Sequence, residues 1–306
     1  MTDVHPYATL EFAQSLAHVG TPFAMPQWGT HVIARQIPGA GIDAVGCYPL
    51  AVLGEDAYLL EGLRLLKDAG FVSVTLVLDD WHRPPIKVLE AVFDVCRPFK
   101  SHNFIHRGHS SSFEGRYAPH RNHRSKIAKA LRAVSCRQID LSEHMDAWCA
   151  MYGALVKRHG MSRVHAFPRE SFERQAAVPG MEAIGGFVEG ELVCVNSWAV
   201  FEGRAHSHLV ASNAKGYETQ AAYAVTDFAI RHFADCDVVN LGGGAGNDDS
   251  GSGLAQFKAG FANAKASGWI CGAILDRPAY NAMTRAGVDA NFFPAYRAPV
   301  RQKEAA

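Results

Sequence analysis

Long apolar segments are absent from the 306-residue sequence, in which no run approaches the roughly 20 residues that cross a membrane as a helix. The opening residues, MTDVHPYATLEF, have no basic region followed by an apolar one and so predict no signal peptide. Hydrophobic residues make up 48% of the chain and charged residues 20%, which excludes a disordered composition. We therefore expect a folded cytoplasmic protein without a membrane span.

Paired cysteines are also lacking. The seven cysteines are an odd number and include no C-x-x-C pair; they stand at positions 47, 96, 136, 149, 194, 236 and 271. Zinc sites and disulfide frameworks require closely spaced or paired cysteines, whereas most of these lie among apolar residues. The pattern predicts buried free thiols and disfavours a zinc site.

Three motifs of common enzyme classes are missing. No G-x-G-x-x-G opens a helix, no P-loop ends in Gly-Lys-Ser/Thr, and no G-x-S-x-G surrounds a serine. These absences disfavour a dinucleotide-binding enzyme of the usual type, a P-loop nucleotidase and a serine hydrolase. Because no cysteine has the setting of a nucleophile either, we expect any group transfer to be direct, without a covalent enzyme intermediate.

The formal net charge is zero, but one segment is strongly basic. Between residues 97 and 132, nine lysines and arginines accompany a single acid, Glu114, which gives a local net charge of +8. The rest of the chain holds 21 bases and 29 acids. This localisation predicts an anionic partner for the basic segment.

Periodicity and turn signals predict two similar sets of elements. The first half holds helices at 10–19, 56–69 and 86–96 and strands at 31–37, 71–78 and 98–106. The second half holds helices at 143–158, 168–177 and 218–233 and strands at 181–188, 192–200, 204–212 and 238–241. In both halves a helix is followed by a short break, a buried strand and a polar loop. This order indicates two degenerate copies of one α/β unit.

The most informative stretch runs from Asp237 to Phe261 and reads DVVNLGGGAGNDDSGSGLAQFKAGF. A short apolar strand leads into Gly242, Gly243 and Gly244, which are followed by a polar loop and an amphipathic turn. Glycine permits a sharp bend or a close approach of the backbone, and open α/β sheets bind ligands where a strand ends in such a loop. An ordinary strand-to-helix connection is the alternative interpretation.

These residues carry a resemblance. The run LGGGAG, the polar loop, GLAQFKAGF and the ending FFPAYR resemble the Fem-type branch of the GNAT acyltransferase superfamily, which includes peptidoglycan-bridge aminoacyl transferases. The resemblance is clearest from about residue 117 to residue 297. It implies an α/β (α+β) fold of two degenerate GNAT-like domains, at 1–115 and 116–306, with mixed twisted sheets flanked by helices. The second of these would be the acyltransferase domain.

The donor is predicted from a departure from the GNAT pattern. GNAT enzymes that use coenzyme A hold its pyrophosphate with a Q/R-x-x-G-x-G/A loop, but the corresponding connection here reads ASNAKGYETQAA and has one glycine, Gly216. This departure, the basic segment and the Phe-Lys pair favour aminoacyl-tRNA as the donor, as in the Fem branch. The amine acceptor is then a peptide, a cell-wall precursor or a small-molecule natural product, and no separate cofactor is expected.

Two alternatives remain open. The chain could be an acyl-CoA-dependent GNAT N-acetyltransferase, in which acyl-CoA is the co-substrate. It could also be a non-catalytic GNAT-fold protein that binds an anionic ligand or RNA through residues 97–132. Stabilisation by acetyl-CoA, by charged tRNA or by neither distinguishes these possibilities.

Lys258 and Phe257 are the expected catalytic pair, because the resemblance places the matching Phe-Lys pair at the reacting ester. Leu254, Phe257 and Phe261 have helical spacing and predict an apolar face. Lys258 starts about 100° around the helix from Phe257, at the edge of that face, from which its ammonium can reach the glycine loop. A cation there stabilises the carbonyl oxygen that becomes negative when an amine attacks. A solvated lysine is the alternative.

Histidines are numerous but do not form a metal-binding pattern. His208 is a candidate base for deprotonating the acceptor amine, since its strand borders the acyl-transfer cleft in GNAT folds. It shares a strand face with His206, and a buried core histidine is the alternative. The histidines at 102, 106, 109, 120 and 123 are interrupted by proline, glycine and serine and are joined by no carboxylate. We expect structural or phosphate-contacting roles for them.

The basic segment supplies one predicted group of substrate-binding residues. Arg121, Arg124 and Lys126 stand at the start of a helix, where arginines and backbone amides favour a phosphate. One face of that helix is expected to be apolar and to carry Ile127, Ala130, Leu131 and Val134. A merely solvated basic face is the alternative.

A second predicted group follows the buried strand of the first half. Asp80, Trp81 and His82 stand at its C-terminal end, mirrored in the second half by Asn240 and the three glycines. We expect these residues, together with Tyr217, to contact substrate, with residues 80–82 holding the acceptor. A loop in which Trp81 simply packs is the alternative.

Overall fold

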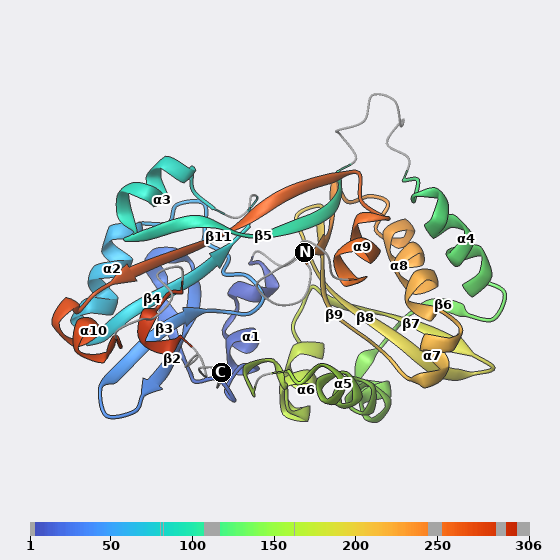
Figure 1. Cartoon of the computed structure of the whole chain (residues 1–306), viewed down its shortest axis with the longest axis horizontal. Coiled ribbons are helices and arrows are strands. Elements are labelled where there is room, and N and C mark those ends of the chain that lie inside the picture. The colour runs from blue at the N-terminus through green and yellow to red at the C-terminus, as the bar shows by residue number, and fades with distance from the viewer. Residues whose placement is uncertain are drawn as a thin grey trace, which may run out of the picture. The chain divides into compact units, whose positions relative to one another are not determined.

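The computed structural model describes residues 4–79, 81, 83–106, 117–161, 163–243, 253–285 and 292–298. The chain divides into two compact units, each built from strands and flanking helices (Figure 1). Unit 1 consists of Met1–His18 and Lys100–Ser267, and unit 2 of Val19–Phe99 and Gly268–Ala306. In the parts of the chain that are described, no helix has both the length and the apolar character needed to cross a bilayer.

Unit 2 has its strands in the order β1-β2-β3-β4-β11. The strands are β1 (Thr21–Met25), β2 (Thr30–Ile37), β3 (Gly41–Gly46), β4 (Phe71–Leu78) and β11 (Ala264–Ile274). The helices are η2 (Pro26–Trp28), α2 (Leu59–Asp68), α3 (Ile86–Val92), α10 (Arg277–Met283) and η6 (Ala295–Arg297). Strands β1 to β3 are an antiparallel meander, β3 and β4 are parallel, and β11 pairs with β4 in the antiparallel sense.

Unit 1 has its strands in the order β5-β10-β9-β8-β7-β6. These are β5 (Val95–His106), β6 (Ser135–Ile139), β7 (Met181–Val188), β8 (Glu191–Phe201), β9 (Arg204–Ser212) and β10 (Val238–Gly242). The α-helices are α1 (Leu10–Gln14), α4 (Arg121–Ala130), α5 (Met145–His159), α6 (Arg169–Ala176), α7 (Ala214–Glu218), α8 (Ala221–His232) and α9 (Gly253–Ala259). Short 3-10 helices are η1 (Pro6–Ala8), η4 (Leu141–His144) and η5 (Arg163–His165).

The two units share one plan, which confirms the predicted repeat and the mixed α/β fold class. An antiparallel meander leads into a parallel pair, β3 and β4 in unit 2 and β9 and β10 in unit 1. A helical connection joins each parallel pair, and a long antiparallel strand lies on the other side. The second strand of each pair is nearly all buried, as its β-branched and apolar sequence predicts.

Tight hairpins join β7 to β8 and β8 to β9, as the sequence predicts. Glu189 and Gly190 have φ values of 51° and 85°, and Glu202 and Gly203 have values of 44° and 70°. Positive φ at both central residues is the geometry of a type I′ turn, whose twist matches that of the flanking strands. This local chemistry fixes the register of the meander.

The two units are not separated by the single boundary expected between residues 115 and 116. The first 18 residues belong to unit 1, and the residues from 268 onward belong to unit 2. Strand β5 begins in unit 2 and ends in unit 1, whereas β11 runs the opposite way. The N-terminal segment packs in unit 1, where Phe12 and Ala13 of α1 are fully buried and α1 contacts α6. Long-range pairing of this kind leaves no signal in a local sequence pattern.

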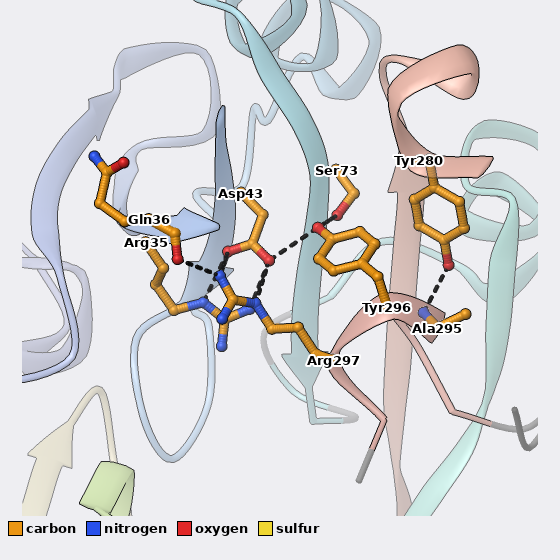
Figure 2. Close-up of polar contacts among 8 residues, drawn as sticks. All are labelled: Arg35, Gln36, Asp43, Ser73, Tyr280, Ala295, Tyr296 and Arg297. Carbon is orange, nitrogen blue, oxygen red and sulfur yellow. Dashed lines mark hydrogen bonds and ion pairs between the residues drawn. The ribbon is translucent and has the colours of Figure 1, made fainter. Parts of the chain in front are cut away.

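The C-terminal segment 292–298 docks in unit 2 through a buried carboxylate (Figure 2). Asp43 of β3 is fully buried and accepts hydrogen bonds from the guanidinium groups of both Arg35 and Arg297. The Tyr296 hydroxyl also donates to it and lies 2.8 Å from the Ser73 hydroxyl. A fully buried charge is tolerated only when it is paired in this way.

The thiols are free, as the sequence predicts. None of the seven cysteines forms a disulfide; Cys47, Cys194, Cys236 and Cys271 are buried and the other three are partly buried. Burial raises the pKa of Cys47 and of Cys194 to about 12, which keeps both thiols protonated.

Candidate functional site

The ammonium of Lys258 lies at the start of the glycine loop, as the sequence predicts. Gly242 ends β10 with a φ of 75°, in the left-handed region that favours glycine. Lys258, carried by α9, donates a hydrogen bond to the Gly243 carbonyl at 2.5 Å. A Cβ atom at Gly242 would lie 3.2 Å from the lysine nitrogen, so a glycine leaves room for the ammonium. Gly244 lies outside the described residues.

At the end of β10 its regular pairing with both neighbouring strands is interrupted. Strand β10 pairs in parallel with β9 over three residue pairs, the last being Asn240 with His206, while β9 continues to Ser212. The ladder with β5 also shifts, because Gly242 rather than Leu241 follows Asn240 in the pairing. Bulges often re-aim the chain beside active sites. Because α/β sheets commonly bind ligands where parallel strands end, the end of this pair is the candidate site.

The two faces of these strands differ in polarity. Val239, Leu241 and Ile105 belong to the apolar core that also contains the buried residues of α8. Side chains alternate along a strand, so the intervening residues point to the opposite face. Beside the buried apolar Val238 and Phe104, that face carries four polar side chains that are each less than a tenth exposed: His102, His206, His208 and Asn240.

Phe257 belongs to an aromatic cluster next to Lys258. Its ring lies 4.8 Å from that of Tyr223 on α8 and 5.1 Å from that of Phe261, both measured between ring centres. Phe261 is 1% exposed, which confirms part of the predicted apolar face. Leu254 is 40% exposed, so its predicted place on that face is wrong. The helix is only seven residues long and begins at Gly253, so its first turn extends past the core.

Helix α4 of the basic segment is fastened to α9. His123 Nε2 lies 2.9 Å from the Phe257 carbonyl oxygen, and the His120 amide donates to the Gly260 carbonyl at 2.8 Å. The His123 ring packs against Phe261 and occupies the space above Gly260, where a Cβ would lie 2.1 Å from the ring. Burial lowers the pKa of His123, which keeps the ring neutral with its Nε2 proton on the carbonyl. Helix α4 therefore begins beside the helix that carries Lys258.

The three cationic side chains predicted to bind phosphate are all exposed. Lys126 donates a hydrogen bond to the Tyr223 hydroxyl at 3.0 Å, which places it on the flank of α4 that faces the aromatic cluster. Arg121 and Arg124 are three residues apart and share another side of the helix, about 140° and 160° from Lys126 respectively. Among the residues that the structure describes, no acid lies within ion-pair distance of these three. Leu131 is 51% exposed, which makes its predicted burial wrong.

His208 has the surroundings of a structural histidine. It is 7% exposed. The Tyr7 hydroxyl lies 3.1 Å from its Nδ1, and the side-chain oxygen Oε1 of Gln175 lies 3.3 Å from its Nε2. Burial lowers the pKa of His208 to about 3, so the ring is neutral and a weak base. This environment does not support the expected role as catalytic base, and we assign His208 to the core.

The remaining expected residues are not gathered at Lys258 by any described contact. Tyr217 of α7 is 45% exposed and its ring packs against the guanidinium of Arg158 at 4.1 Å. Trp81 is half-buried in unit 2, and its amide donates to Asp79 Oδ1. Asp80 and His82 lie outside the described residues. Within the described ranges, no three histidine, cysteine or acidic side chains are placed to share a metal ion.

Tyr223 was not predicted to belong to this site, and His123 was predicted only to have a structural or phosphate-contacting role, of which the structure shows the structural one. His123 lies in α4 and Tyr223 in α8. His123 lies four residues before Ile127 and shares its buried face, a spacing that does predict burial. The contact between His123 and Gly260 joins elements more than 130 residues apart, which no local pattern reveals.

Comparisons with solved structures decide the fold. FemX superposes with a TM-score of 0.64 at 12% identity, over 91% of this chain and 95% of that one. This chain has the fold of FemX. The C-terminal domain (DUF2156) assigned to a lysylphosphatidylglycerol synthetase of Agrobacterium fabrum gives 0.61 at 12% identity, over 89% and 90% of the two chains. L-PGS from Bacillus licheniformis gives 0.55 at 11% identity, over 88% and 93%. No family model and no curated protein matches the sequence.

Proposed function

We propose that this protein is an N-acyltransferase that moves an aminoacyl group from aminoacyl-tRNA to an amine acceptor. The observation that carries the proposal is the position of the Lys258 ammonium, 2.5 Å from the Gly243 carbonyl at the end of the parallel strand β10. The Fem-type fold supports it, because FemX and L-PGS share that architecture. The acceptor is a peptide, a cell-wall precursor or a small-molecule amine.

The chemistry follows from the charge that such a transfer creates. The acceptor amine attacks the ester carbonyl, and the carbonyl oxygen becomes negative as the new C–N bond forms. Lys258 supplies a preplaced cation for that oxygen. The ester C–O bond then breaks, the ribose oxygen of the tRNA leaves, and the proton lost by the amine ends on that oxygen. Phe257 packs beside Lys258 and helps to keep water from the reacting ester.

The basic helix supports a nucleic-acid carrier. Arg121, Arg124 and Lys126 are exposed on α4, whose N-terminal turn is held against α9 by His123. A tRNA bound along α4 through its phosphates would have its aminoacyl end close to Lys258. The spread of the three cations over two sides of the helix suits a large, curved anion better than a single phosphate.

The connection between β9 and α8 disfavours coenzyme A. The Gly216 amide donates to the Asn213 side chain at 2.8 Å, which caps α7. A Cβ at Gly216 would lie 2.2 Å from the Val193 carbonyl oxygen, so packing against β8 explains this glycine. An amide already bonded within the protein does not serve a pyrophosphate.

Asp80, Trp81 and His82, which follow β4, are our proposed contacts for the acceptor. Their support is their place after the central parallel strand of unit 2, which corresponds to the glycine loop after β10 in unit 1. An Asp80→Ala variant with an unaltered Michaelis constant for the acceptor and unaltered turnover would remove this assignment.

Ligand-induced stabilisation tests the donor. A ligand present at 100 times its dissociation constant adds about 2.7 kcal/mol to the free energy of unfolding. We expect stabilisation by charged tRNA and none by acetyl-CoA. Stabilisation by acetyl-CoA alone would favour an N-acetyltransferase instead, and stabilisation equal for charged and uncharged tRNA would favour a non-catalytic RNA-binding protein.

A further inference from the structure

The end of β10 is held by a side chain as well as by the strand ladder. Asn240 is 3% exposed, and its Oδ1 accepts a hydrogen bond from the Gly242 amide at 2.8 Å. An asparagine bonded to the backbone two residues ahead closes a local turn. Gly242, whose amide closes this turn, has a φ of 75° in the left-handed region that favours glycine. The side chain of Asn240 therefore sets the direction in which the chain leaves the sheet.

The other end of the Asn240 carboxamide is fixed too. Its nitrogen lies 3.4 Å from Nδ1 of His102 on β5. Since the Gly242 amide is a donor, the carboxamide must turn its oxygen to Gly242 and its nitrogen to His102. His102 then accepts at Nδ1, and in the neutral ring its proton is on Nε2. The carboxamide thus has one orientation.

The turn delivers a carbonyl to Lys258. The residue after Gly242 is Gly243, whose carbonyl oxygen accepts the hydrogen bond of the Lys258 ammonium. The hydrogen bonds of Asn240 to His102 on β5 and to Gly242 therefore affect where the Lys258 side chain of α9 lies. Asn240 was predicted to contact substrate, but both ends of its carboxamide bind other groups of the protein.

We propose that Asn240 is a positioning residue: it fixes the turn at Gly242 and Gly243 and so holds the Lys258 ammonium at the mouth of the glycine loop. The effect on the position of Lys258 depends on the structure alone. The effect on turnover rests on the proposed function, because it requires that Lys258 acts on the ester.

Substitutions at Asn240 separate the two bonds. Aspartate keeps the acceptor for the Gly242 amide and loses the donor, and neutral His102 can restore that contact by carrying its proton on Nδ1. Leucine has nearly the same shape and loses both bonds. Asn240→Asp should therefore keep the turn and Asn240→Leu should release it.

Competitive acetylation measures the outcome. The folded protein is treated with a trace of acetic anhydride, and mass spectrometry compares the acetylation of Lys258 with that of the exposed Lys129 in the same molecule. We expect the Lys258-to-Lys129 ratio to rise about fivefold in Asn240→Leu, the factor that one ordinary hydrogen bond represents. In Asn240→Asp the ratio should stay close to that of the wild type.

Asn196→Leu is the matched control. Asn196 lies on β8 of the same unit, is 1% exposed and accepts a hydrogen bond from the Ser207 hydroxyl. Its loss removes a buried carboxamide without touching the glycine loop, so the ratio should not change. Asn240→Ala provides a smaller replacement should leucine prevent folding, and all labelling is done well below the melting temperature of each variant.

The proposal is overturned if folded Asn240→Leu or Asn240→Ala keeps the wild-type ratio, or if Asn196→Leu raises the ratio equally. Turnover is measured in parallel with aminoacyl-tRNA. A changed ratio in a protein that transfers nothing would leave the positioning role standing and reject the proposed function. An unchanged ratio in an active enzyme would do the reverse.

Discussion

Arg297 donates from Nε and Nη2 to the two carboxylate oxygens of Asp43, at 2.6 and 3.0 Å (Figure 2). Arg35 binds the same two oxygens from β2, so one buried acid serves two arginines. The C-terminal segment is thereby attached to a strand more than 250 residues earlier. This relationship explains how the FFPAYR motif, residues 292–297, is held in unit 2.

Asp43→Asn should destabilise unit 2 by about 3 kcal/mol, because it leaves two partly buried guanidinium groups without a carboxylate. Arg297→Met should cost less, since Asp43 keeps Arg35 as its partner. Unfolding in urea, followed by tryptophan fluorescence, measures both; Trp28 is fully buried in this unit, and Trp81 and Trp269 also belong to it. A larger cost for Arg297→Met than for Asp43→Asn would contradict the assignment of Asp43 as the centre of the network.

Gly260→Ala should destabilise unit 1 by about 1–3 kcal/mol, because its methyl group would overlap the buried ring of His123. The double variant with His123→Ala should recover much of that loss, since the overlap is gone. Gly253→Ala, at the first residue of α9, is the control, because a Cβ there meets nothing within 4 Å. Equal costs for the two glycine variants would show that α4 does not pack on α9 in this way.

Binding of tRNA should depend on Arg121 and Arg124. Each phosphate contact contributes roughly 0.7–0.9 to the slope of log affinity against log salt, so replacing both arginines by alanine should reduce that slope by about 1.5. Lys87→Ala, an exposed lysine on α3 of unit 2, is the control and should leave the slope unchanged. An unaltered slope in the double variant would exclude α4 as the phosphate-binding element.

His208 should make the protein less stable in acid. Its folded pKa of about 3 lies below the ordinary value of 6.5, so the unfolded chain binds the proton more tightly. Stability from this group is complete above pH 6.5 and decreases as the pH falls toward 3, by about 2 kcal/mol between pH 7 and pH 5. His208→Gln should remove that part of the pH dependence of urea unfolding. An identical pH dependence in the variant would contradict burial of a neutral ring.

Local chemistry predicted much of the fold. The run FVSVTLVL identified β4, and the Glu-Gly pairs identified both hairpins, because continuous β-branched residues and positive-φ turns act over a few residues. Strands β1 and β3 were missed, since TPFAM and GIDAVG contain proline or glycine and alternate poorly. Strands β5 and β11 each run from one unit into the other. This arrangement depends on pairing between distant segments, which leaves no periodic signal in the sequence.

Local sequence patterns also predicted part of the candidate site. The position of Lys258 was predicted from its spacing from Phe257, whereas its catalytic role was implied by the resemblance; the glycines predicted where the strand bends. The role of His208 was not predictable, because burial decides whether a histidine is a base or a core residue. Leu254 and Leu131 have the spacing of core residues, but whether the core extends to them depends on packing with other elements.

The most direct test offers the protein labelled amino acids with total tRNA, the aminoacyl-tRNA synthetases and an extract of small amines and peptides, and identifies products by mass spectrometry. The account predicts a labelled amide that requires tRNA, is not replaced by an acetylated product when acetyl-CoA is supplied, and forms about 100-fold more slowly with Lys258→Met. Lys87→Met, at an exposed position on α3 outside the basic segment, is the control and should retain wild-type turnover. Wild-type turnover in a folded Lys258→Met protein, or acetylation without tRNA, would contradict the central claim.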